Sequence, residues 1–471
     1  MQMPQLLTQD AIHSIYESAR NILSTLGVEF EMDSARQLLR KHGAALDGKR
    51  VLMPPGLLDR SLAMMPTHHE PPANGRRLVA ASPFCNAPMI ADSATGRMRR
   101  GTIGDAVKMY QLAETSGLYE SVNPGVADPA ENDSDDPFVS QVAMLLKYSD
   151  KWPALGIYAT RSNAKNGDVR TSAITAIQLI KEIRENHENP VMSQVICPLS
   201  PMSYGEESLI NLDVLAGEGQ NITISPCTLS FMTGPESLMG IITHDIAVSL
   251  AGAVYIQLLK PGTGVSFSNG STMTDMRTMQ PAYGCPEYLY TQIMFYEVCR
   301  SLGMNAVLCG CLSDGTRTDY QAGVESCFTA MAPFTMADVT EVFCYPGHLA
   351  AFSGGSFEKM ICDEEMMANC NRLLRAPDLS PDPLLMDKLA RSLETKSFLT
   401  IGDVKIYRKE HRLTTIFDKK GLGSENAAPE PPTDLNVKKE IERRCHAYQL
   451  PERSKTQKKA LQQYLPGPCK Y

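Results

Sequence analysis

The chain has 471 residues, of which 43% are hydrophobic and 21% are charged, an ordinary balance for a globular protein. Its formal net charge of −8 argues against a general nucleic-acid binder, which would need a basic face. We find no apolar run near the ~20 residues of a membrane span, and the first residues lack the regions of a signal peptide. The thirteen cysteines are scattered and lie mostly within apolar runs, which is typical of reduced thiols, so we expect a cytoplasmic protein.

The first 75 residues are predicted to form a helical extension. Apolar positions recur at helical spacing over residues 8–26 and stop at Gly27, a residue type that commonly ends helices. A second helix is expected over residues 32–41. Because little strand signal is present, we interpret this segment as a decoration of the main domain.

Two short apolar runs follow, at residues 77–81 and 88–91, and we expect them to form a short β-hairpin or paired strands. Five of the six residues 131–136 are acidic or amide-bearing, a composition that could suggest a metal site. Their spacing does not match a calcium-binding loop, so we favour a solvated loop that caps the helix beginning at Pro137.

Between residues 187 and 358, strand-sized apolar runs end in small or polar residues and then lead into helices. Alternating strands and helices imply parallel pairing, because each return to the sheet needs a crossover. The repeat of roughly 35–45 residues predicts a (β/α)8 barrel over residues 76–376, with its chemistry on the loops that follow the strands. The runs that predict strands are 190–198, 221–228, 264–269, 305–309 and 338–343.

The last segment, residues 377–471, is predicted to consist of C-terminal helices and a tail. The pattern breaks at the proline-rich residues 377–383, and a helix is expected to follow as far as Lys396. The final fifty residues are polar and basic. We interpret them as an appendage that covers a neighbouring subunit, which indicates a homo-oligomer.

The best metal candidate is the pair Cys309 and Cys311, since residues two apart on a strand point to the same face. With Cys227 or Cys344 the pair could complete a thiolate zinc site. The alternative is that these cysteines are small apolar side chains that fill the interior, which is the more common use of such residues.

Aromatic side chains gather at the predicted strand ends. Ring faces are the usual means of holding a quaternary ammonium ion, which has no proton to donate. His348, Arg277 and Arg317 lie nearby in the sequence, and each could pair with a carboxylate of the same ligand. Taken alone, aromatic residues at strand ends are more often packing than a binding site. They are Tyr204, Phe231, Phe267, Phe343, Tyr345, Phe352 and Phe357.

Several well-known signatures are missing from the sequence: the GxxxxGK[ST] phosphate loop, the GxGxxG fingerprint after a strand, and HExxH. The DxHxxG motif of corrinoid-binding proteins is also missing, so we expect this chain to carry no cobalamin of its own.

Specific strings resemble the trimethylamine methyltransferase (MttB) family. They occur in order at residues 275–279, 284–287, 313–314 and 319–325, and the last two carry a Ser-Asp and an Asp-x-Gln-Ala-Gly-x-Glu pattern. The resemblance extends outward and covers nearly the whole chain. It implies a TIM barrel. The outlying matches are residues 22–28, residues 95–97 with Thr102 and Asp105, and residues 234–235 and 407–411.

One departure from the family's pattern narrows the expected substrate. Trimethylamine enzymes of the family carry pyrrolysine, and this chain contains only the ordinary twenty residues. Members without pyrrolysine are similar to quaternary amine methyltransferases, which act on betaines such as proline betaine, glycine betaine, carnitine or γ-butyrobetaine. The implied methyl acceptor is Co(I) of a cob(I)alamin-type corrinoid on a separate partner protein, with no cofactor bound by this chain.

The chemistry of a quaternary amine fits this subgroup. A neutral tertiary amine leaves without needing a proton, so the reaction requires neither a general acid nor zinc. Charge decreases as Co(I) removes the methyl group, and a water-poor aromatic site should therefore favour the transition state. Two other classes remain open: a zinc-dependent thiol or methoxyl methyltransferase, and a non-catalytic betaine-binding protein.

The resemblance and the residue pattern together suggest roles for individual side chains. We expect aromatic residues to surround the ammonium group, and His348 or Arg317 to bind the carboxylate. Asp314 is the catalytic candidate, acting at long range on the cation or holding a loop. The expected aromatic residues are Phe231, Phe343, Tyr345 and Phe357.

Overall fold

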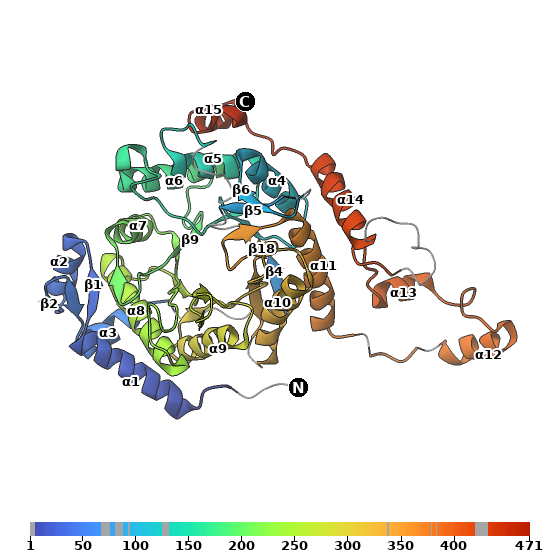
Figure 1. Cartoon of the computed structure of the whole chain (residues 1–471), viewed down its shortest axis with the longest axis horizontal. Helices are drawn as coiled ribbons and strands as arrows, with labels where there is room; N and C mark the ends of the chain where they lie inside the picture. Colours follow the sequence, from blue (N-terminus) through green and yellow to red (C-terminus); the bar gives the residue numbers. More distant parts are fainter. Residues whose placement is uncertain are drawn as a thin grey trace.

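A computed structural model of the chain shows strands at its centre with helices around them (Figure 1). An N-terminal unit lies on one flank, and part of the C-terminal segment extends from the other. The structure describes residues 5–66, 76–80, 88–92, 95–124, 131–336, 339–377, 379–382, 384–419 and 432–471.

Two sheets at the centre are built from parallel strands. Neighbouring strands within each sheet come mostly from consecutive parts of the chain. Residues 81 and 338, which bound two predicted strands, lie outside the described residues. The first sheet contains β7 (Ser121–Val122), β8 (Trp152–Leu155), β9 (Ser193–Ile196), β11 (Asn221–Ile224), β12 (Val265–Phe267) and β15 (Asn305–Ala306), and the second contains β4 (Arg77–Ala80), β16 (Cys309–Gly310) and β17 (Glu341–Cys344).

Backbone hydrogen bonds join these two sheets at both ends. β15 and β16 belong to one extended stretch, in which Val307 donates its N–H to Phe267 at 2.8 Å, while Leu308 accepts from Phe343 at 2.9 Å. At the other junction, the N–H of Ala80 donates to the carbonyl of Leu118 at 3.2 Å. The carbonyl of Ala80 accepts from the N–H of Glu120 at 3.1 Å. The structure therefore has the mixed helix-and-strand content that the sequence predicts.

A helix follows each parallel strand or strand pair, and several begin at a side chain that caps them. Thr102 and Asp105 form a reciprocal capping box, so the first of these helices starts at Ile103. Asp136 accepts from the N–H of Val139 and so caps the next helix. The helices are α4 (Ile103–Glu114), α5 (Pro137–Tyr148), α6 (Val169–Arg184), α7 (Glu206–Gly217), α8 (Leu238–Leu259), α9 (Pro286–Ser301), α10 (Tyr320–Met331) and α11 (Phe357–Leu374).

Helix α8 corrects the expectation that no apolar run approaches the length of a membrane span. It has 22 residues and is apolar enough to cross a membrane by length and composition, but 83% of its most apolar window is buried inside the protein. It packs between α1, α3, α7 and α9, which explains why it is apolar on all sides. We interpret α8 as a core helix.

The expected hairpin between residues 77–81 and 88–91 is wrong. β4 pairs in parallel with β17, whereas β5 (Met89–Ala91) pairs antiparallel with β6 (Met98–Arg100). β5 also pairs with β19 (Gly354–Gly355), which in turn pairs with β18 (His348–Leu349). The segments that follow β4 and β17 therefore build a further small sheet together.

The N-terminal unit contains strands as well as the expected helices. Its helices are α1 (Gln9–Thr25), α2 (Asp33–Lys41) and α3 (Pro55–Leu62), and α1 buries its apolar stripe against α8. Strands of three residues are too short to show an alternating pattern, so the sequence did not indicate them. They are β1 (Val28–Phe30), β2 (Ala45–Asp47) and β3 (Arg50–Leu52), joined by β10 (Ser203–Tyr204).

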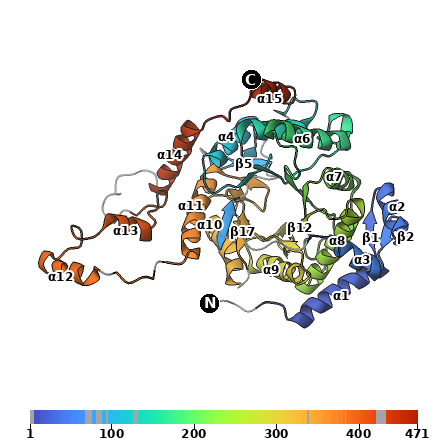
Figure 2. The same cartoon turned by 180° about the vertical axis from the view of Figure 1, so that it is seen from behind.

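The C-terminal segment contains α12 (Leu385–Thr395), α13 (Val404–Glu410), α14 (Pro432–Ala447) and α15 (Lys455–Gln462). Helix α14 packs on α11 and α4, and α15 packs on α6 and α5. Arg444 is buried and donates to Glu364 at 2.8 Å. The last forty residues thus cover this chain's own body rather than a neighbouring subunit, whereas α12 and α13 extend away from it (Figures 1 and 2).

Candidate active site at the strand ends

Two loops meet beyond the carboxyl ends of the parallel strands. The loop after β17 contains β18 and β19, and the loop after β12 contains the short hairpin β13 (Thr274–Asp275) and β14 (Gln280–Pro281) before α9 begins. In parallel α/β folds this end of the strands is where ligands bind, so the side chains that these loops bring together form the candidate site.

Five ring side chains, from these loops and from the first turn of α9, form one aromatic cluster. Phe352 lies at its centre, with ring centroids 4.7 Å from His348, 5.1 Å from Tyr283 and 6.1 Å from Tyr345. Tyr288 extends the cluster, 5.2 Å from the ring of Tyr283. All of these pairs meet edge to face. The aromatic cluster therefore joins residues that lie far apart in the sequence.

The imidazole of His348 is completely buried in this cluster. Among the described residues, neither of its ring nitrogens has a hydrogen-bond partner. Burial, together with the nearby cation of Lys359, lowers the pKa of His348 to about 3. The ring is therefore neutral near pH 7, with one N–H donor that the described residues do not use.

A buried ion pair fixes the backbone that carries His348. The ammonium of Lys359, on α11, lies 2.6 Å from the carboxylate of Asp363 and donates to Ser326 at 2.6 Å. The same carboxylate accepts from the N–H of Gly347 at 2.8 Å. Gly347 has a φ of +90°, which glycine adopts at little cost, so the pair holds the turn just before His348.

The segment that presents Phe352 is strained. Three consecutive residues, Ala350, Ala351 and Phe352, have φ values of +49°, +51° and +70°. Left-handed backbone at non-glycine residues costs about 1–3 kcal/mol each and persists only when surrounding contacts enforce it. Here Ala350 donates to the carbonyl of Gly315 at 2.8 Å and Ala351 donates to Ser313 at 3.1 Å.

Asp314, in the loop after β16, binds the loop that carries Tyr283. Its carboxylate accepts from the backbone N–H groups of Tyr283 at 2.9 Å and Gly284 at 2.8 Å. Burial raises the pKa of Asp314, although these two hydrogen bonds act in the opposite direction. Glu325 accepts in turn from the N–H of Asp314 at 2.9 Å. Asp314 is thus a loop-holding residue, and a direct role in chemistry stays a prediction.

The predicted aromatic residues fall into different places. Tyr345 belongs to the cluster, and Phe343, two residues earlier on β17, shares its face of the strand and is half-buried. Phe357 is buried at the start of α11, where the ammonium of Lys108 lies 4.5 Å from its ring. Phe231 is 67% exposed.

The candidate ligands of the carboxylate also lie in different parts of the structure. Arg317 is exposed in the loop after β16, whereas His348 lies in the aromatic cluster. Arg277 is exposed and pairs with Asp275 at 2.7 Å. Sequence reasoning missed Tyr283 and Tyr288, although their position beside Pro286, at the start of a helix after a strand, was a usable signal.

The cysteines do not gather into a metal site in the described part of the chain. No group of three or more His, Cys, Asp or Glu side chains there could hold a metal ion. The thiol of Cys309 lies 3.8 Å from the hydroxyl of Tyr345, and burial raises its pKa to about 11. Cys311 and Cys344 are buried. This arrangement favours the interpretation of these residues as apolar filling.

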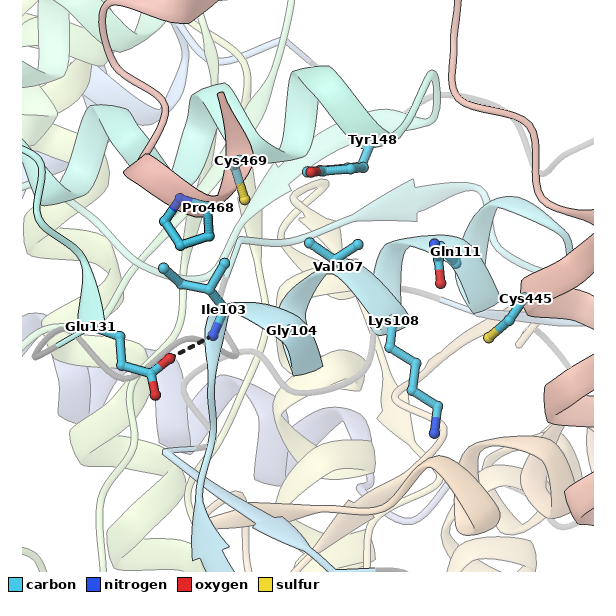
Figure 3. A pocket seen from close by; sticks show the side chains of 10 residues that line it. All are labelled: Ile103, Gly104, Val107, Lys108, Gln111, Glu131, Tyr148, Cys445, Pro468 and Cys469. Carbon is cyan, nitrogen blue, oxygen red and sulfur yellow. Dashed lines mark hydrogen bonds between the residues drawn. The ribbon is translucent and has the colours of Figure 1, made fainter. Parts of the chain in front are cut away.

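A hollow of about 710 Å³ lies elsewhere, on the outer side of α4 (Figure 3). Val107 and Lys108 of α4 face Cys445 of α14 and the C-terminal Cys469 across it. Glu131 accepts from the N–H of Ile103 at one edge. Because none of the aromatic cluster or predicted site residues lines this hollow, we do not assign the active site to it.

Comparison with known proteins identifies the family. The model of the family "Trimethylamine methyltransferase (MTTB)" matches residues 1–466. The chain belongs to the trimethylamine methyltransferase family. The family that the sequence strings indicated is therefore confirmed, and members of this family are methyltransferases.

Relatives within the family are similar over most of their length. The proline betaine:corrinoid methyltransferase of Eubacterium limosum is 31% identical, over 98% of this chain and 97% of the relative. The L-carnitine:corrinoid methyltransferase of the same organism is 28% identical with the same coverage. The glycine betaine methyltransferase of Desulfitobacterium hafniense (strain Y51) is 27% identical, over 88% and 87%. A solved monomethylamine methyltransferase of Methanosarcina barkeri aligns with 94% of this chain and 98% of its own, at 9% identity and a TM-score of 0.45.

Proposed function

We propose that this chain transfers an N-methyl group from a betaine to Co(I) of a corrinoid held by a separate protein. Proline betaine is the first candidate substrate, in line with the 31% identity to the proline betaine enzyme. The C–N bond breaks with its electron pair left on nitrogen, and the methyl group becomes methyl-Co(III). The product amine is neutral, so no side chain has to supply a proton.

The observation that carries this proposal is the aromatic cluster that contains His348, an uncharged ring with no hydrogen-bond partner among the described residues. Electron-rich rings attract a quaternary ammonium group, and their edge-to-face packing keeps water out of the site. We propose that Tyr345, Phe352 and Tyr283 bind the ammonium, with Phe343 below them on β17. Phe357 is a weaker candidate, because the cation of Lys108 already lies over its ring.

We propose His348 rather than Arg317 as the principal carboxylate ligand. His348 has an N–H donor inside the cluster that the described residues leave unused. Arg317, exposed on the rim, would meet a carboxylate in water, where an ion pair contributes little.

We also propose that the parallel strands and their helices form a (β/α)8 barrel as the catalytic domain over residues 76–376. The order of parallel neighbours from β4 and β7 round to β17 supports it, as do the hydrogen bonds at both sheet junctions. In such a barrel the aromatic cluster would lie at the mouth, where a docked cobalt could reach an outward-facing methyl group.

The corrinoid protein would dock on the rim of this mouth. Exposed apolar side chains lie on the loops that follow β9, β11, β12 and β16, and large exposed apolar patches are typical of protein interfaces. Three of them are methionines, which adapt to a partner that must bind and leave in each cycle. The rim residues are Leu199, Phe231, Met232, Met276, Met279 and Tyr320.

We further propose a cytoplasmic location.

Substrate-affinity measurements with three variants test the assignment of the carboxylate ligand and the aromatic cluster. We expect His348→Ala to raise the KM for the betaine at least tenfold, since about 1.5–3 kcal/mol is typical of a hydrogen bond to a charged group. Arg317→Ala should change KM less than threefold. Phe352→Ala should weaken binding of the betaine more than binding of its uncharged tertiary amine product, as measured by calorimetry.

An unchanged KM and kcat in His348→Ala would remove His348 from the site. Equal losses for betaine and amine in Phe352→Ala would argue that the ring only supports the fold. Elemental analysis of the purified protein distinguishes the proposed betaine enzyme from a zinc-dependent thiol or methoxyl methyltransferase, because the latter would need bound metal.

A further inference from the structure

The segment of residues 384–413, which we call the arm, leaves the body of the protein between α11 and α14. It contains α12 and α13 and extends outward in both views (Figures 1 and 2). No side chain of α12 or α13 is buried. By contrast, α14 and α15, farther along the chain, bury residues against the body.

Helix α12 has one apolar face that nothing in the described chain covers. Leu385, Leu389 and Leu393 repeat every four residues, whereas Arg391 and Glu394 lie on the opposite side. An isolated helix of this length is marginal in water, so it needs a partner surface to be stable. The large apolar side chains of the arm, each 40–96% exposed, are Leu384, Leu385, Met386, Leu389, Leu393, Phe398, Leu399, Val404, Ile406, Tyr407 and Leu413.

The C-terminal end of the arm is fixed to α11, the helix that precedes the arm in the chain. Arg372 of α11 donates to the carbonyl of Glu410 at 2.9 Å. Arg412 donates to the carboxylate of Glu365 at 2.7 Å and to the side chain of Asn369 at 2.6 Å, both on α11. The arm therefore leaves α11 and returns to it, which makes it a projecting element rather than a loose chain end.

We propose that the arm embraces a second copy of this chain, which covers the apolar face of α12. The exposed apolar side chains of one arm offer on the order of 1,000 Å², and two exchanged arms would exceed the area of a standard interface. Such reciprocal exchange is the usual geometry of a symmetric dimer, because the same surface is used twice.

The charge of the arm fits the same occupant. It carries seven Lys or Arg residues and four Asp or Glu residues, whereas the whole chain has a net charge of −8. A basic arm on an acidic protein is attracted to another copy of that protein, provided that its own body does not cover it.

The composition and direction of the arm argue for a permanent partner. Obligate interfaces are more apolar than those of partners that bind and dissociate, and a second copy is always present. In Figure 1 the arm extends sideways from the ring of helices α4 to α11. A protein that approaches the strand ends would meet the rim loops instead. The inference does not depend on the methyl-transfer reaction.

Sedimentation equilibrium of the full-length protein tests this proposal with two variants of α12. We expect the wild type to be a dimer or a larger assembly at micromolar concentration. Leu389→Ser with Leu393→Ser should raise the dissociation constant roughly 100-fold or more, because two leucines per arm lose their buried surface. The matched control Arg391→Ser, on the opposite face of the same helix, should change it less than about threefold.

Hydrogen exchange measured on the same samples keeps the test decisive if the double variant aggregates. The amides of Leu385–Thr395 should exchange slowly in the assembled wild type and rapidly in the monomer after dilution, while those of α14 stay protected in both. A monomeric wild type, or a double variant that assembles as tightly as the wild type, would overturn the proposal. Rapid exchange of α12 in an assembled wild type would overturn it as well.

Discussion

The most informative single residue is His348, because proteins rarely leave a buried polar side chain without a partner. Its ring contacts Tyr345 and Phe352, yet both nitrogens lack a hydrogen bond among the described residues. Such a group costs stability in the free protein. A ligand that accepts its N–H would recover that free energy, and the proposed function gives this role to the betaine carboxylate.

The burial of His348 predicts how stability depends on pH. Its pKa of about 3 in the folded state lies below the ordinary value of 6.5, so the unfolded state binds the extra proton as the pH falls between these values. Stability should therefore fall by about 2–3 kcal/mol between pH 6.5 and pH 4.5 from this group alone. Urea unfolding of the wild type and of His348→Gln measures the contribution, which the variant should lose.

The exposed His13 provides the matched control, and His13→Gln should leave the pH dependence of the wild type in place. If His348→Gln shows the same loss between pH 6.5 and pH 4.5 as the wild type, His348 is not held neutral by burial, and the carboxylate-binding role loses its physical basis.

At the scale of elements, the site depends on loops that hold one another. Asp314 binds the backbone before α9, and its neighbours Ser313 and Gly315 accept from the strained residues 350–351. The loops after β12, β16 and β17 are thus linked by hydrogen bonds rather than by strand pairing. A change in one loop should displace aromatic rings in another.

We expect Asp314→Ala to loosen these loops although Asp314 does not contact the ligand. Two backbone N–H groups, of Tyr283 and Gly284, lose a charged acceptor, which predicts about 2–3 kcal/mol of lost stability in urea unfolding. The KM for the betaine should rise, because Tyr283 moves. Asp275→Ala, which breaks an exposed ion pair with Arg277 in the neighbouring loop, should change stability far less than Asp314→Ala. A kcat loss in Asp314→Ala with full stability and unchanged KM would instead favour direct action on the cation.

The elements show how far the sequence could be interpreted. The strand-helix alternation and the cap at Thr102 were predictable, because both depend on local residue patterns. The strands of two or three residues were not, since they carry too little periodicity to be detected. The hairpin of residues 77–81 and 88–91 was wrong because β4 found a partner in β17, about 260 residues away, and local spacing cannot reveal such a pairing.

At the scale of the whole molecule, the family was visible in the sequence and the site only in part. Tyr345 and His348 were predicted because they follow a recognisable strand, and both belong to the aromatic cluster. Tyr283 and Tyr288 were missed because only the folded chain brings their loop against Phe352. The tail was assigned to a neighbouring subunit, but α14 and α15 cover this chain and α12 and α13 do not.

The central claim is best tested by mixing the purified protein with a Co(I) corrinoid protein and following methyl-Co(III) formation by absorbance. The substrates are proline betaine, glycine betaine, carnitine and γ-butyrobetaine, with trimethylamine and methanol as controls. We predict rapid methylation with one betaine and none with trimethylamine or methanol. Tight binding of a betaine by calorimetry without methylation from any quaternary amine would contradict the claim and favour a binding protein.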